Sequence, residues 1–258
     1  MLIQNLLVRK INNAVGILKE KGLKGFGSAA KEELLRVSDF RGRRDKKALN
    51  KILRSSAKDL SETIIFFPGV DWNLPLFQRP QQLARHLART GCLVFYCTSN
   101  VTYDNFHGFS VLEPRLCLTD RPDILMSELK GCWIMVSSIA YMNVETIREF
   151  KNLGFRILYD YMDEINPEIC GDLTEDYMRR HTALDIESVD MVTVISKKLY
   201  DEMLMRFPAL MVEFIPNAVD YEHFHIERNI DRCPEDIKPI VLNKRPIIGY
   251  HGALAKWI

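Results

Sequence analysis

The common signatures of metal, redox and nucleotide chemistry are missing from this sequence. The six cysteines form no CxxC pair and no zinc-ligand spacing, and no two histidines are spaced as metal ligands with a carboxylate. Neither GxGxxG nor a P-loop occurs, so NAD or ATP binding through those loops has no support, and no serine stands in a nucleophile-elbow setting. We therefore expect no bound metal and no cofactor.

Long apolar runs are also missing. No stretch without a charged residue exceeds 14 residues, as in GCWIMVSSIAYMNV at 131–144, whereas a helix that spans a bilayer needs about 20 apolar residues. The start, MLIQNLLVRK, has no basic segment before its apolar one, unlike a secretory signal. Most cysteines lie within apolar runs and are interpreted as reduced core residues. We expect a cytoplasmic protein that is neither secreted nor integral to a membrane.

The net charge of +1 hides a division along the chain. Residues 1–60 hold 15 Lys and Arg against 6 Asp and Glu, while residues 61–258 hold 20 against 28. Apolar residues recur at helical spacing in this basic front, from Ile3 to Leu18 and from Leu49 to Ala57. The front is predicted to be a helical extension that packs on the body or on a partner. A second reading is an amphipathic stretch, residues 1–58, that lies on an anionic membrane surface, whereas no recognition motif supports nucleic acid.

From residue 61 onward the pattern changes to short apolar runs that alternate with helical ones. The runs are rich in β-branched and aromatic residues: TIIFFP (63–68), CLVFYC (92–97), CWIMVS (132–137), RILYDY (156–161), MVTVIS (191–196) and VEFIP (212–216). Strands that are apolar on both sides and alternate with helices predict an α/β fold with a doubly wound parallel sheet. We expect this Rossmann-like domain at 61–220, a linker at 221–245 and the start of another domain at 246–258.

Several element boundaries have local causes in the sequence. Pro80 suits the first turn of a helix, where its missing N–H is not needed. Gly91 and Gly154 are placed to end helices before the next strand. Ser196 is predicted to cap the helix that starts at Lys197, and a long helix is predicted over 173–190.

The loop after the first predicted strand is the most informative segment. GVDWNLPLFQR, Gly69 to Arg79, places eleven residues between strand and helix, where such connections usually have about 2–6. It combines aromatic rings with hydrogen-bonding side chains, the residue types that hold a polyhydroxylated ligand. In a structural alternative, Trp72 and Phe77 only close the top of the sheet.

Five segments in order resemble one enzyme family. They are FFPGVDWNLPLFQRPQQLARHLARTGCLVFY, LYDYMDE, DMVTVISKKL, IPNAVDYEHF and IIGYHGALAKWI. Together these pieces, which span about 195 residues, resemble the GT-B glycosyltransferases of the large retaining family 4 group, with the nearest likeness to bacterial members acting on cell-surface polysaccharides. IPNAVDYEHF is the most characteristic piece alone, and the basic front lies outside the resemblance.

The resemblance implies a two-lobed enzyme that transfers a sugar from a nucleotide-sugar donor to a polysaccharide or lipid-linked acceptor without a bound metal ion. One lobe shapes the acceptor side, and the other holds the donor. This sequence then contains the acceptor lobe and the start of the donor lobe, so the chain alone is expected to be inactive. The rest would be missing or supplied by a separate chain. The residues expected on the donor side are His251, Gly252, Ala253, Leu254 and Lys256.

On the acceptor side, the candidates lie where the first, third and fourth predicted strands end. These are Asp71, Trp72, Asn73, Gln78, Arg79, Ser137, Ser138 and Asp160. Asp163 is the candidate base that orients or deprotonates the acceptor hydroxyl, and its alternatives are a helix cap or a partner for Arg79. Two other functions remain open: a non-catalytic module that binds saccharide or a partner protein through the same cleft, and a sugar-nucleotide epimerase, which lacks these segments.

Overall fold

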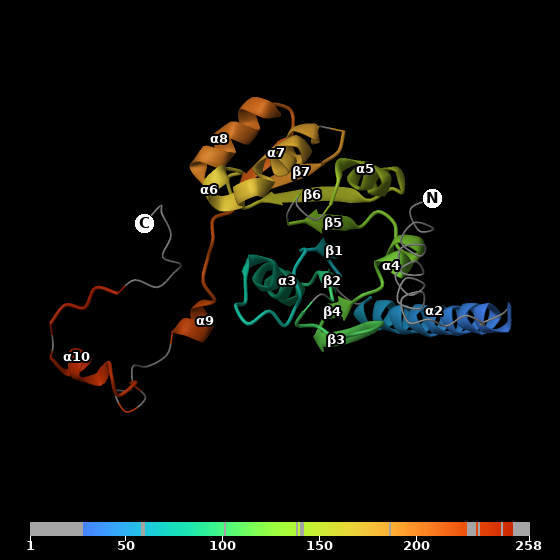
Figure 1. The fold of residues 1–258 in the computed structure, drawn as a ribbon, viewed down its shortest axis with the longest axis horizontal. Coiled ribbons are helices and arrows are strands. Elements are labelled where there is room, and N and C mark those ends of the chain that lie inside the picture. Colours follow the sequence, from blue (N-terminus) through green and yellow to red (C-terminus); the bar gives the residue numbers. More distant parts are fainter. Residues whose placement is uncertain are drawn as a thin grey trace.

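The computed structural model describes residues 28–57, 60–100, 102–137, 139, 142–185, 187–225, 231, 233–243 and 245–249. It confirms the expected α/β class: helices cover a single eight-stranded sheet in the order β3-β4-β2-β1-β5-β6-β7-β8 (Figure 1). The strands are β1 (Thr63–Phe67), β2 (Leu93–Cys97), β3 (Phe109–Glu113), β4 (Leu116–Thr119), β5 (Trp133–Val136), β6 (Arg156–Tyr161), β7 (Met191–Val194) and β8 (Met211–Phe214).

The strand order reverses direction at the centre of the sheet. From β1 the chain moves outward to β2 and to the edge strand β3, returns to β4 between them, then crosses to β5 on the other side of β1 and continues to β8. All neighbours pair in parallel except β3, which runs antiparallel to β4. In such a doubly wound sheet, ligands bind beyond the carboxyl ends of the strands at the point of reversal. Here that point lies between β1 and β5.

Residues along each strand alternate between two hydrophobic cores, one on each face. The larger core contains Ile65, Ile134 and Ile157 and is closed by helices on its side of the sheet. The smaller core contains Phe66 and Tyr96 and is closed by α3. The helices are α2 (Ser28–Ser56), α3 (Arg79–Arg89), α4 (Pro122–Glu128), α5 (Val144–Asn152), α6 (Pro167–Cys170), α7 (Thr174–Ala183), α8 (Lys197–Arg206), α9 (Tyr221–Phe224) and α10 (Lys238–Leu242), with a 3₁₀ turn at Gly171–Leu173.

The predicted boundaries hold where a single residue type decides them. Gly91 and Gly154 follow helices with φ of 106° and 89°, a backbone conformation that glycine adopts without strain. Ser196 caps α8 by accepting a hydrogen bond from the Leu199 N–H at 3.3 Å. Pro80 lies in the first turn of α3.

Two element predictions were incomplete. The helix predicted over 173–190 ends at Ala183, because Leu184 adopts extended backbone angles. No element was predicted between residues 98 and 131, where β3, β4 and α4 lie. These three elements have at most seven residues, and β3 is only partly buried at the sheet edge, so none shows a clear period.

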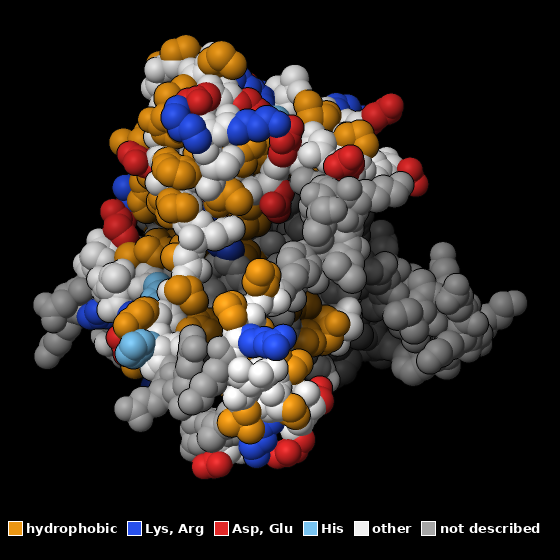
Figure 2. Space-filling view, turned by 90° about the vertical axis from the view of Figure 1, so that its left-hand side faces the viewer, with side chains coloured by type: hydrophobic (Ala, Val, Ile, Leu, Met, Phe, Trp, Pro, Cys, Tyr) orange, Lys and Arg blue, Asp and Glu red, His pale blue; other side chains and the backbone are white. Residues whose placement is uncertain are grey.

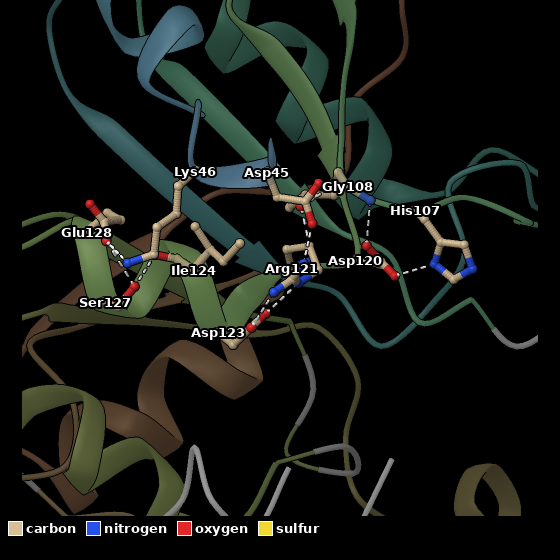
Figure 3. Close-up of polar contacts among 11 residues, drawn as sticks. Asp45, Lys46, His107, Gly108, Asp120, Arg121, Asp123, Ile124, Ser127 and Glu128 are labelled. Carbon is tan, nitrogen blue, oxygen red and sulfur yellow. Dashed lines mark hydrogen bonds and ion pairs between the residues drawn. The ribbon is translucent and has the colours of Figure 1, made fainter. Parts of the chain in front are cut away.

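The end of α2 belongs to the same core as the sheet. Leu49 is 1% exposed and lies in the larger core with Ile52. Asp45 pairs with Arg121, and the Lys46 Nζ lies 2.7 Å from the Glu128 Oε1 on α4 (Figure 3). The α/β body therefore begins within α2.

After β8 the chain still contacts the body at Ile215, Pro216 and Asn217 and then leaves it as an arm. We call residues 215–249 the C-terminal arm; it contains α9 and α10 and extends away from the sheet in Figure 1. Figure 2 faces the side of the molecule that carries the arm and shows hydrophobic side chains scattered over its surface. The large exposed ones on the arm are Ile215, Val219, Tyr221, Phe224, Ile237, Ile240, Val241, Leu242, Ile247 and Ile248. No helix in the described parts of the chain has the length and apolar character to cross a membrane.

Candidate functional site

A buried ion pair lies at the carboxyl edge of the sheet. The Arg79 Nε and Nη2 donate to the two carboxylate oxygens of Asp160, both at 3.0 Å. Asp160 is 0% exposed on β6, and its Oδ1 also accepts from the Thr193 hydroxyl of β7 at 2.7 Å. Two parallel charge-assisted bonds fix both the distance and the plane of the guanidinium. The pair thus holds the start of α3 against the ends of β6 and β7.

The same guanidinium reaches the segment that follows β8. The Arg79 Nη1 lies 3.4 Å from the Pro216 carbonyl oxygen and 3.3 Å from the Asn217 Oδ1. Neither Thr193 nor Asn217 was among the residues expected from the sequence, although both lie in segments that carried the family resemblance. Asn217 is in contact because the guanidinium of Arg79 presents several donors, and Thr193 because it lies beside Asp160. No local sequence pattern predicts either contact.

Arg79 is placed by the start of α3. Gln78 is the N-cap residue, and its N–H donates to the Gln81 Oε1 at 3.0 Å. Gln81 is fully buried and donates from its Nε2 to the carbonyl oxygen of Asp71 at 3.3 Å. The expected ligand-binding residue Gln78 therefore forms part of the helix start and fixes the direction of the neighbouring Arg79.

Two carboxylates lock the loop between β1 and α3. The Asp71 Oδ2 accepts from the backbone N–H groups of Thr102 and Tyr103, both at 2.8 Å. In return, Asp104 accepts from the Trp72 N–H at 2.6 Å and from the Asn73 side-chain amide at 2.7 Å. The β1–α3 loop thus supplies Asp71 for the backbone donors of the loop that follows β2. The loop after β2 in turn supplies Asp104 for the donors of the β1–α3 loop. Asp71 and Asn73, both expected to hold a ligand, are engaged in these contacts.

Trp72 is likewise part of the packing. Its ring is 8% exposed and lies edge-on to Phe77 at 5.2 Å and to Tyr96 at 5.0 Å between centroids. The Arg85 guanidinium lies 4.6 Å from the centroid of the Phe77 ring. This arrangement matches the structural alternative weighed from the sequence, in which Trp72 and Phe77 close the top of the sheet.

Ser137 differs from the other candidates because its hydroxyl has no hydrogen-bond partner among the described residues. The residue is 2% exposed and follows β5, with its N–H 3.5 Å from the Phe67 carbonyl oxygen at the end of β1. It therefore lies at the reversal of the strand order. A buried hydroxyl without a partner is unfavourable by about 1–3 kcal/mol. A ligand that bound here and supplied a donor or acceptor would relieve that cost.

Asp163 is exposed in the loop after β6, and no hydrogen bond or ion pair joins it to another described residue. Arg79 pairs with Asp160 instead, so the alternative role of Asp163 as its partner is wrong. The neighbouring Glu164 pairs with Lys198 at 2.6 Å. Ser138 and the five expected donor-side residues, His251, Gly252, Ala253, Leu254 and Lys256, lie outside the described residues.

A second buried polar cluster lies near the end of β6, in the larger core. The His181 Nδ1 lies 3.4 Å from the Tyr159 hydroxyl, and its Nε2 lies 3.5 Å from the Glu202 Oε1. Burial, with a smaller contribution from the charge of Arg206, lowers the pKa of His181 to about 4. Burial also raises the pKa of Tyr161 to about 12 and raises that of Glu202. His181 is therefore neutral at neutral pH and acts as a packed polar residue.

The site as a whole consists of a rigid frame formed by Arg79, Asp160, Thr193 and the β1–α3 loop. At the strand ends beside this frame, the Ser137 hydroxyl is buried and Asp163 is exposed. Among the described residues, no group of His, Cys, Asp or Glu is arranged to hold a metal ion. Comparisons with protein-family models, curated proteins and solved structures gave no match for this chain.

Proposed function

We propose that this chain provides the acceptor-side lobe of a GT-B glycosyltransferase, which transfers a sugar from a nucleotide-sugar donor to a polysaccharide or lipid-linked acceptor. One observation carries the proposal. Four of the five segments that resemble the family meet in a single hydrogen-bonded network: Arg79 from the first, Asp160 from the second, Thr193 from the third, and Pro216 with Asn217 from the fourth.

The network gives these residues a positioning role. Since the Asp160 carboxylate accepts from two of the Arg79 guanidinium nitrogens, that guanidinium is not free to bind an anionic ligand strongly. The pair instead holds the ends of β6, β7 and β8 at fixed positions around the reversal between β1 and β5. An acceptor sugar would then contact Ser137, and Asp163 would orient or deprotonate its reacting hydroxyl.

The donor would be held by a second lobe, formed by residues from 246 onward or by a separate chain. His251, Gly252, Ala253, Leu254 and Lys256 are the proposed donor contacts, and backbone N–H groups near a leaving diphosphate are usually the largest catalytic contribution. As part of the same proposal, the enzyme works in the cytoplasm at the inner face of a membrane, where lipid-linked acceptors are found.

The test is saccharide binding by the chain 1–258 and two matched serine variants. Saturation-transfer NMR with a panel of bacterial oligosaccharides should detect binding, and Ser137→Ala should weaken it at least about fivefold without lowering the melting temperature, because the lost hydroxyl has no partner. Ser188→Ala is the control. Its buried hydroxyl bonds Asp185 at 2.5 Å, so it should lower stability and leave binding unchanged.

No saccharide binding by the intact chain, or equal binding by Ser137→Ala, would reject the proposal. Saccharide binding that yields no transfer even when a chain carrying the donor lobe is added would instead indicate the non-catalytic binding module.

A further inference from the structure

The outward side of α2 carries a row of exposed cations, which we call the cationic face: Arg43, Arg44, Lys47, Lys51 and Arg54. At 3.6 residues per turn these side chains fall within an arc of about 100°, opposite the buried Leu49 and Ile52. Over residues 41–54 the helix has seven Lys and Arg against one acidic residue, Asp45.

The orientation of this face is fixed by the other side of the helix. Asp45 pairs with Arg121, which also bonds Asp123. Lys46 reaches across to Glu128 on α4 (Figure 3). Asp45, the single acidic residue of the segment, is therefore paired on the side of the helix that faces the body. Leu49 packs in the larger core on the same side. As a result, the cationic face is held rigidly away from the body.

We propose that the cationic face of α2 docks the protein on an anionic phospholipid membrane surface. Clusters of four to eight basic residues on a helix are attracted to anionic lipid headgroups. The remainder of the chain, residues 61–258, has 28 acidic against 20 basic residues and is repelled by the same surface. An orientation with α2 toward the lipid is therefore favoured over orientations that bring the net acidic part of the chain to the surface.

Features of the helix favour lipid over nucleic acid. No DNA-recognition motif accompanies these cations in the sequence. Single-stranded nucleic acids are held by aromatic side chains on which bases stack, and the cationic face has none. A flat anionic surface requires neither. This proposal rests on α2 alone and stands independently of the sugar chemistry proposed above.

Vesicle cosedimentation with the full chain tests the proposal. The protein should bind phosphatidylcholine vesicles that contain phosphatidylserine, and not those of phosphatidylcholine alone. The double variant Lys47→Glu with Lys51→Glu should bind at least about tenfold more weakly. Binding of the intact chain should also fall as salt rises above about 0.1 M, where the screening length is about 10 Å.

The matched control changes the net charge by the same amount elsewhere. Lys197 on α8 and Arg245 on the C-terminal arm are both exposed, so Lys197→Glu with Arg245→Glu should bind vesicles as the intact chain does. Equal loss in both double variants would show a net-charge effect and overturn the proposal. So would an absence of vesicle binding, or tighter binding to a random-sequence RNA than to phosphatidylserine vesicles.

Discussion

The α/β body and the C-terminal arm both contain many apolar residues but use them differently. In the body, the strand side chains are mostly buried, and Ile65, Ile134 and Ile157 are each 0% exposed. In the arm, Ile240 is 54% exposed and Ile248 is 100% exposed. The buried polar residues at the carboxyl edge of the body also have partners. Arg79 pairs with Asp160, and Asp71 and Asp104 each accept hydrogen bonds from the loop that carries the other.

The difference shows that an apolar pattern specifies an element only where another surface covers it. α9 and α10 have four and five residues, well below the roughly 12–15 that an isolated helix needs in water. α9 and α10 therefore need to pack against another surface to be stable, and the other described residues provide little such packing. The two regions should respond to substitution in opposite ways.

The largest effect is expected at the buried ion pair. Asp160→Ala leaves the Arg79 guanidinium without its carboxylate and should lower the free energy of unfolding by about 3–5 kcal/mol. Urea denaturation followed by circular dichroism measures it. Asp163→Ala, three residues away and exposed, should change stability by less than about 0.5 kcal/mol. A similar small change in both variants would mean that the pair does not hold the body together.

The extent of the body can be tested at α2. Leu49→Ala creates a cavity in the larger core and should destabilise the protein by about 2–5 kcal/mol. Leu60→Ala provides the control, because Leu60 is exposed and should contribute less than about 0.5 kcal/mol. If Leu49→Ala proves harmless in the same denaturation experiment, α2 lies outside the cooperative unit and the body begins at the sheet.

A pH-dependent effect is expected from His181. Its pKa falls from the ordinary 6.5 to about 4 on folding, so the unfolded chain binds the proton first. The stability it contributes is complete above about pH 6.5 and is lost as the pH falls toward 4, a change of about 3 kcal/mol. The raised pKa of Glu202 acts in the opposite direction, since its contribution is present at low pH and is lost as the pH rises.

His181→Gln should flatten this part of the stability–pH curve measured by urea denaturation. His86→Gln, on the exposed side of α3, should keep it. An unchanged slope in His181→Gln would mean that other groups cause the acid loss of stability.

The smallest effect is expected in the arm. Ile240→Ala on α10 removes an exposed side chain and should change the free energy of unfolding by less than about 0.5 kcal/mol, in contrast to the core isoleucine Ile157, where the same substitution should cost about 2–5 kcal/mol. A loss above about 1 kcal/mol at Ile240 in differential scanning calorimetry would show that the arm packs on something in solution and would remove the contrast between the regions.

The sequence was sufficient for the elements of the central sheet and for their caps. Strand 156–161 was predicted with its observed bounds, because a mostly apolar run between Gly154 and a polar loop predicts a strand of that length. It was insufficient for β3, β4 and α4, which are too short or too exposed to show a period. Elements of that kind depend on the sheet that they join.

The candidate site was less predictable than the fold. The sequence identified Arg79 and Asp160, but not that they bond each other, because they are 81 positions apart and meet only through the strand order. Asp71 and Asn73 were expected to face a ligand, and the reason they do not is Asp104, which no spacing connected to that loop. The position of Ser137 after a predicted strand marks it in the sequence, but the lack of a described partner for its hydroxyl follows only from the three-dimensional structure.

The two outer strands of the sheet have a consequence for the solubility of the protein. β8 has only four residues, and Glu213 is exposed in it. At the other end, the register of β3 against β4 shifts between Val111 and Glu113. Short, charged or irregular outer strands are poor templates for the strands of other molecules. The short length of β8 and the irregular register of β3 therefore limit pairing with other chains at the two edges, although Met211 and Phe214 of β8 are exposed.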